Sequence, residues 1–200
     1  MNSKDKDNKG KALPPGQFAI KHLLRWGKDH PTIGGPVPQI DLEKWALVID
    51  GEIAKPLKLD WNEIIELPRI ESISNFHCVE GWSILGLKWE GIQFRTIIEL
   101  VKPNENAKFV TFQCADAYTT SLSIKELSRE DILLAYKLNE EYLEAGIGAP
   151  LRLVVPNKYA YKSAMWITRI YFTKDKELGY WESRVCSDTA DVWSNGRFSK

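Results

Sequence analysis

Cysteine is scarce in this 200-residue sequence: Cys78, Cys114 and Cys186 lie far apart and form no Cys-x-x-Cys pair. Three widely spaced cysteines do not make a disulfide framework, and they fit a reducing compartment. Histidine is equally rare, and His22 and His30 show no ligand spacing with each other. We therefore expect no disulfide and no zinc site.

An excess of one charge and long apolar runs are also missing. The 27 basic residues balance 27 acidic ones, so no overall field favours a nucleic acid or an anionic membrane. The charged N-terminus has no apolar segment behind it long enough for a signal peptide or a membrane span. We therefore expect residues 1–12 to form a disordered tail, a cytoplasmic location, no nucleic-acid partner and no membrane insertion.

Apolar and aromatic residues are plentiful. Hydrophobic residues make up 44% of the sequence, with 8 Trp, 7 Tyr and 7 Phe, which suffices for the core of one domain. We expect that domain to cover residues 13–200. Short segments typical of strands recur at residues 46–51, 70–76, 108–114, 132–137, 151–155 and 166–173.

Two segments predict short helices. Within residues 59–68, Asp60 is the expected N-cap and Pro68 the stop signal. The clearest helix covers residues 94–101. Because there is no repeat, heptad or low-complexity segment, strands interspersed with short helices predict an α+β domain rather than a regular βαβ array.

The most informative stretch is Phe76-His77-Cys78-Val79-Glu80-Gly81-Trp82-Ser83. Residues 70–76 before it alternate apolar and polar side chains as in a half-buried strand, and Gly81 permits a sharp turn. Cys78 is therefore expected at a strand end, where a thiol can bind a soft metal. A lone cysteine beside aromatic residues is more often a small buried hydrophobe, so this run alone leaves both interpretations open.

Three further blocks extend this pattern. In order, the four blocks are residues 77–83 with 89–91, 114–122, 148–156 with 158–166, and 179–182 with 191–193. Together they resemble the molybdopterin-dependent oxidoreductases of the sulfite oxidase type, which include the catalytic subunit of a methionine sulfoxide reductase. The resemblance implies mixed β-sheets with short surrounding helices and molybdenum held by molybdopterin. It also implies a small-molecule substrate and a separate electron-transfer protein, such as a haem subunit.

The resemblance makes Cys78 the metal ligand, because a thiolate suits a molybdenum ion already held by dithiolene sulfurs. Cys114, at a second expected strand end, is the competing thiol and is placed beside the cofactor. Cys186 matches no motif of the family. His77 faces away from Cys78 on an alternating strand; a structural hydrogen bond is its expected role, and a backbone contact to the pterin is the alternative.

The pterin phosphate calls for cations and backbone N–H groups. Arg152 matches the family's arginine just after Ala-Pro. The loop that wraps the pterin is matched by Lys158, Lys162, Ser163, Ala164 and Met165, and further candidates in the N-terminal segment are Arg25 and His30. Read without the resemblance, the same block is equally a core strand followed by a solvated loop.

Two residues depart from the family pattern. Met165 stands where many relatives have lysine, and Ile147 stands where the named families have histidine or asparagine. A cofactor contact is therefore replaced or lost. These departures leave a non-catalytic binding module as one alternative function.

Sulfite oxidases proper carry arginines just after the metal-binding cysteine, where this sequence has Glu80 and Trp82. Reduction of an S-oxide or N-oxide is therefore favoured over sulfite oxidation.

Tyr118 could hydrogen-bond a metal-bound oxygen, and Asp116 is the other expected catalytic residue, although both are also typical of a turn. A cysteine hydrolase with Cys78 as nucleophile is a further alternative, and it would need a histidine base nearby in space.

Overall fold

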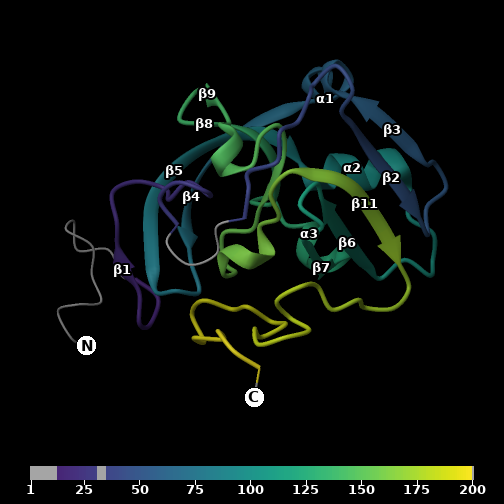
Figure 1. Cartoon of the computed structure of the whole chain (residues 1–200). Coiled ribbons are helices and arrows are strands. Elements are labelled where there is room, and N and C mark those ends of the chain that lie inside the picture. The colour runs from purple at the N-terminus through teal and green to yellow at the C-terminus, as the bar shows by residue number, and fades with distance from the viewer. Residues whose placement is uncertain (1–12, 31–34, 200) are drawn as a thin grey trace.

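The computed structural model describes residues 13–30 and 35–199. The tail expected at residues 1–12 lies outside the described residues. Two β-sheets form the scaffold, and the C-terminal segment, yellow in Figure 1, runs across one end of both. This mixture of sheets with a few short helices confirms the predicted α+β class.

The first sheet has six strands built around the long strand β5. Its members are β1 (Phe18–Ala19), β4 (Arg69–His77), β5 (Trp82–Gln93), β8 (Leu133–Leu138), β9 (Glu141–Tyr142) and β10 (Arg152–Val154). The path β1-β5-β8-β10 is joined by β4, which pairs with β5, and by β9, which pairs with β8. β1 pairs in parallel and the other pairs are antiparallel. The β4–β5 hairpin carries Cys78 in its turn.

The second sheet has five strands in the order β3-β2-β11-β6-β7. They are β2 (Ala46–Gly51), β3 (Leu57–Asp60), β6 (Phe109–Cys114), β7 (Thr119–Ser123) and β11 (Ile167–Thr173). β11 runs parallel to β2, and the other pairs are antiparallel. The turn of the β6–β7 hairpin contains Asp116 and Tyr118, so each sheet contributes one hairpin turn to the region described below.

The helices are short, and α1 and α2 lie where the sequence predicts. They are α1 (Trp61–Glu66), α2 (Phe94–Val101), α3 (Ile124–Leu127) and the 3₁₀ helices η2 (Ala145–Ile147) and η3 (Ala160–Lys162). Asp60 caps α1 through a capping box with Glu63, which satisfies two backbone N–H groups at once. In α2, the buried side chains Phe94, Ile97 and Val101 lie on one face.

Strand β8 of the six-stranded sheet is buried on both faces of the sheet. Leu134 and Tyr136 point into the larger core cluster, which also holds residues of the five-stranded sheet and α2. Leu133 and Ala135 point into a second cluster that contains Cys78. Burial on both faces explains why residues 132–136 are continuously apolar. Cys78 therefore belongs to the smaller cluster, on the face turned away from the main core.

Strand β5 is the main element that the sequence pattern did not predict. Its 12 residues mix buried aromatic side chains with glycine and charged residues, so neither a simple alternation nor an apolar run marks it. The predicted inward alternation of residues 70–76 is also wrong at Ile73, which is 72% exposed. Ile70 and Phe76, by contrast, both pack in or against the smaller core cluster, and a register irregularity lies between Ser74 and Phe76.

All three cysteines are free and buried. Among the helices that the structure describes, none combines the length and apolar character needed to cross a membrane.

Candidate active site

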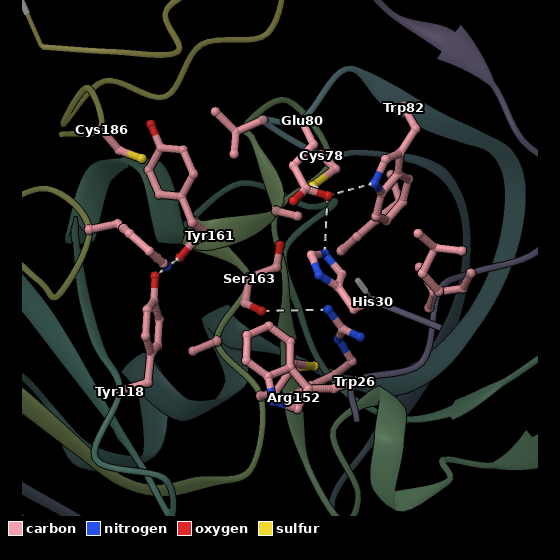
Figure 2. Close-up of a pocket in the computed structure, with 18 of the residues that line it drawn as sticks. Trp26, His30, Cys78, Glu80, Trp82, Tyr118, Arg152, Tyr161, Ser163 and Cys186 are labelled. Atoms are coloured by element: carbon pink, nitrogen blue, oxygen red, sulfur yellow. Dashed lines mark hydrogen bonds and ion pairs between the residues drawn. The ribbon is translucent and has the colours of Figure 1, made fainter. Parts of the chain in front are cut away.

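A cavity of about 340 Å³ lies between the Cys78 turn and the loop that follows β10. Six parts of the chain line it: the N-terminal arm (residues 13–30), the Cys78 turn (residues 76–82), the β6–β7 turn, Arg152, the loop 160–166 and the C-terminal strap (residues 174–199). Figure 2 shows Cys78, Glu80 and His30 on one side of this space and Tyr118 and Tyr161 on the other. Residues distant in sequence thus converge on one site.

A tight turn holds Cys78 at the cavity wall. The Cys78 N–H donates to the Trp82 carbonyl at 2.8 Å, and the Gly81 N–H donates to the Cys78 carbonyl at 3.1 Å. Gly81 has a φ of +106°, which confirms the predicted sharp turn. A Cβ at Gly81 would meet the Gly16 carbonyl at 3.3 Å. The glycine therefore also lets the arm pack against the turn.

The Cys78 thiol is buried beside a carboxylate and an imidazole. Burial raises the pKa of Cys78 to about 12, and the nearby Glu80 charge adds to that increase. Glu80 Oε2 lies 3.9 Å from Cys78 Sγ and 3.2 Å from His30 Nε2. The structure thus supplies the histidine that a cysteine hydrolase would need. A thiol with a raised pKa is, however, a poor nucleophile near neutral pH. A bound metal cation would stabilise the thiolate, so the surroundings of Cys78 favour a role as metal ligand.

Arg152 is a buried cation without a carboxylate partner among its described hydrogen bonds. Its Nη1 donates to the Ile147 carbonyl at 2.7 Å and its Nη2 to the Ser163 carbonyl at 3.5 Å, whereas Nε has no partner among the described residues. The guanidinium also lies over the rings of Phe76 and Trp89. Burial lowers the pKa of Arg152 to about 9. The side chain is therefore still a cation at neutral pH, and it would be stabilised by a bound anion.

Some of the predicted cofactor-binding residues in the loop after β10 line the cavity, and others lie away from it. Ser163, Ala164 and Met165 line the cavity. Lys162 does not: its Nζ is fully buried in ion pairs with Glu182 and Asp188. Lys158 is likewise absent from the lining and pairs with Glu126 at 2.8 Å. Both lysines hold other parts of this chain, so the structure does not bring them to the cavity as a phosphate site would require.

The two residues with predicted catalytic roles both reach the cavity. The Tyr118 hydroxyl donates to the Tyr161 carbonyl at 2.5 Å, and burial raises its pKa well above the usual value. The Asp116 carboxylate accepts the Tyr118 N–H at 3.0 Å, as in an Asx turn. The ring of Tyr118 thus forms a wall, while its hydroxyl is already engaged by the backbone.

Three further candidates lie outside the lining. Cys114 is buried in the main core. His77 is buried with its Nδ1 2.7 Å from the Ser83 hydroxyl, which is the structural hydrogen bond expected for it. Arg25 is partly exposed and pairs with Glu144 at 2.9 Å. Of the N-terminal candidates, only His30 reaches the cavity.

Sequence reasoning missed most of the walls contributed by the two chain ends. Trp26 comes from the N-terminal arm, and Val185, Cys186 and Phe198 come from the C-terminal strap. Trp181 of the same strap also lines the cavity. The signal that could have found them is the frequency of large apolar residues in segments without strand or helix periodicity, because such residues need a surface to cover.

Comparison with known proteins agrees with this geometry. Residues 34–181 match the family described as "Oxidoreductase molybdopterin binding domain". The chain is 37% identical over 166 residues to the "Uncharacterized oxidoreductase YuiH" of Bacillus subtilis, with 82% of this chain and 84% of that protein covered. The chain therefore belongs to the molybdopterin-binding oxidoreductase family: it is an enzyme, and molybdopterin is its cofactor.

Two other similarities are consistent with this family. The chain is 37% identical to the "Protein-methionine-sulfoxide reductase catalytic subunit MsrP" of Campylobacter jejuni over 73% of its length, and it spans 54% of that protein. The crystal structure of the sulfane dehydrogenase SoxCD from Paracoccus pantotrophus superposes with a TM-score of 0.65 at 17% identity, covering 74% of this chain and 42% of that one. The second similarity concerns the fold alone.

The cavity fits molybdopterin. Cys78 offers a soft ligand to molybdenum, and Arg152 offers a buried guanidinium with an unused Nε donor to an anionic group. Met165 and Trp166 form part of a largely apolar wall on which a flat ring system could pack. At the two departures from the family pattern, Met165 lines this wall and the Ile147 carbonyl orients Arg152. The backbone of Ile147 thus makes a contact that needs no polar side chain.

Proposed function

We propose that this enzyme reduces small neutral S-oxides or N-oxides rather than oxidising sulfite. The observation that carries the proposal is the position of the Glu80 carboxylate, 3.9 Å from the thiol that we expect to hold molybdenum. A doubly charged oxyanion at the metal would be repelled by this carboxylate, and its transfer out of water without cations would be costly. A neutral oxide avoids both penalties.

The remaining charges of the cavity support the same substrate class. Arg152 is the one lysine or arginine among the described residues that line it, and its Nη groups already donate to backbone carbonyls. Most of the other walls are apolar, with Trp26, Trp166 and Trp181 among them. Such walls favour an uncharged substrate with an apolar body. Two relatives named as methionine-sulfoxide reductase subunits also support reduction of an S-oxide.

In the proposed reaction an S-oxide takes up two electrons and two protons and gives a thioether and water. Bound molybdopterin supplies the two-electron chemistry, and a separate electron-transfer protein supplies the electrons. Cys78 holds the metal, Arg152 holds an anionic part of the cofactor, and the aromatic walls exclude water from the substrate. The three free thiols support our further proposal that the protein works in a reducing, cytoplasmic compartment.

Paired assays test the direction of the reaction. Reduced viologen would serve as donor for a panel of S-oxides and N-oxides, and ferricyanide as acceptor for sulfite. We expect turnover of neutral oxides and little oxidation of sulfite, with sulfite oxidation rising in Glu80→Gln because the repelling charge is removed. Efficient sulfite oxidation by the wild-type protein, unchanged by Glu80→Gln at equal molybdenum content, would overturn the proposal.

A further inference from the structure

We propose that His30, Cys78 and Glu80 form a zinc site that binds Zn²⁺ when molybdopterin is absent. Along the sequence these residues show no zinc motif, but the fold brings the N-terminal arm against the Cys78 turn (Figure 2). The ligand atoms that the three side chains offer all lie within 4.8 Å of one another. The proposal does not depend on the substrate of the enzyme.

The distances suit a tetrahedral ion. Zinc bonds of about 2.0–2.3 Å place neighbouring ligand atoms roughly 3.3–3.6 Å apart. His30 Nε2 lies 3.2 Å from Glu80 Oε2, and that oxygen lies 3.9 Å from Cys78 Sγ. Small side-chain movements therefore bring nitrogen, oxygen and sulfur around one ion. The fourth position faces the cavity, where water can occupy it.

Charge and hydrogen bonding also favour an ion at this place. A thiolate and a carboxylate neutralise Zn²⁺, so the occupied site carries no net charge into an apolar cavity. Trp82 Nε1 donates to Glu80 Oε2 at 3.3 Å, an outer contact of the kind that orients metal ligands.

The arm holds His30 in place without any metal. The Trp26 ring lies 5.4 Å from the His30 ring and 6.2 Å from that of Trp166. The Trp26 N–H donates to the Gly146 carbonyl at 2.7 Å. The histidine is therefore positioned in advance, which lowers the ordering cost of binding. Because zinc and molybdenum both need the Cys78 thiolate, the two metals exclude each other, and zinc links the arm to the turn until the cofactor arrives.

Cobalt(II) is the spectroscopic probe for this site. Full-length protein would be produced in a host unable to make molybdopterin, and its circular dichroism compared with that of the cofactor-loaded protein. We expect one equivalent of cobalt to give a thiolate-to-cobalt charge-transfer band, which added zinc abolishes. Cys78→Ser should lose the band. His30→Ala should bind cobalt at least about tenfold more weakly, whereas the matched variant His22→Ala, at an exposed position, should bind as the wild type does.

Two conservative variants separate ligation from structural support. His30→Cys should restore cobalt binding, because it returns a soft ligand to the same position. Trp82→Phe should weaken binding by roughly tenfold, because Glu80 loses its orienting donor. The proposal is overturned if folded wild-type protein gives no thiolate band, if the band survives Cys78→Ser, or if His30→Ala and His22→Ala bind cobalt equally well.

Discussion

At the residue scale, two buried polar groups give the cavity its chemistry. Cys78 is 7% exposed and its pKa is raised to about 12, while Arg152 is 2% exposed and its pKa is lowered to about 9. In both cases burial disfavours the charged form. Each group therefore gains from a partner of opposite charge: the thiolate from a metal cation, and the guanidinium from an anion.

Replacing the ligand should abolish the redox reaction while leaving the fold intact. Cys78→Ser removes the soft donor and changes the side-chain volume little, so we expect loss of most bound molybdenum and of viologen-dependent activity. Metal analysis and circular dichroism would be measured on the same preparation. Wild-type activity in Cys78→Ser protein at full cofactor loading would contradict the assignment.

Replacing the buried cation should weaken cofactor retention. A lost charge-assisted hydrogen bond costs about 1.5–3 kcal/mol, so Arg152→Ala should copurify with clearly less pterin, measured by fluorescence of the oxidised cofactor. Arg25→Ala removes the same charge from a partly exposed position outside the cavity and serves as the control. Equal pterin loss in both variants would contradict a specific role for Arg152 in holding the cofactor.

At the scale of elements, buried polar contacts fasten the C-terminal strap to η3 and to β7 of the five-stranded sheet. Lys162 at the end of η3 pairs with Glu182, and both side chains are fully buried. Glu182 also accepts the Thr120 hydroxyl of β7 at 2.6 Å. The strap contributes Trp181, Cys186 and other walls of the cavity. Lys162 thus serves the site by anchoring the strap, rather than through the phosphate contact that the resemblance implied.

Breaking this pair should destabilise the protein strongly. Glu182→Ala leaves a buried ammonium short of its main partner, and we expect a loss of about 3–5 kcal/mol in the free energy of unfolding. Asp188→Ala should cost about 1 kcal/mol or less, because that carboxylate is partly exposed. Urea denaturation would measure both. In the double variant Lys162→Met/Glu182→Leu much of the stability should return, and failure to recover any would point to a packing role instead.

At the scale of the whole molecule, His77 links the first sheet to the N-terminal arm. Its Nδ1 lies 2.7 Å from the Ser83 hydroxyl of β5, which in turn donates to the Gln17 amide oxygen at 2.8 Å. Burial lowers the pKa of His77 from 6.5 to about 4. The folded protein therefore takes up a proton here less readily than the unfolded chain does.

This shift predicts a dependence of stability on pH. Above pH 6.5 the imidazole is neutral in both the folded and the unfolded protein, so it does not lower the free energy of unfolding. As pH falls from 6.5 to about 4, the unfolded chain binds the proton first, so the free energy of unfolding should fall by up to roughly 3 kcal/mol. His77→Gln should flatten that part of the profile, measured by urea denaturation at a series of pH values. Parallel profiles for the two proteins would contradict the assignment.

Local features of this protein could be predicted from the sequence. The cap at Asp60, the helix at residues 94–101, the turn at Gly81 and the strand end before Cys78 depend on side-chain period and backbone preference within a few residues. The cofactor was implied separately, by the resemblance of the four blocks to a known family. Strand β5 was missed, because its residues pack and pair with three neighbouring strands and so do not follow a single local period.

Only the tertiary structure decided which side chains meet. His30 reaches Glu80 because the arm packs beside the β4–β5 turn, and Lys162 turns away from the cavity because the strap places Glu182 over it. Sequence spacing carries no information about either contact, since each depends on how separate segments pack across the two sheets. Through the family resemblance, the sequence by itself indicated the class of cofactor and the thiol that we propose as metal ligand. The packing of the two terminal segments determined the charges and walls of the cavity, because those contacts join segments that lie far apart in the sequence.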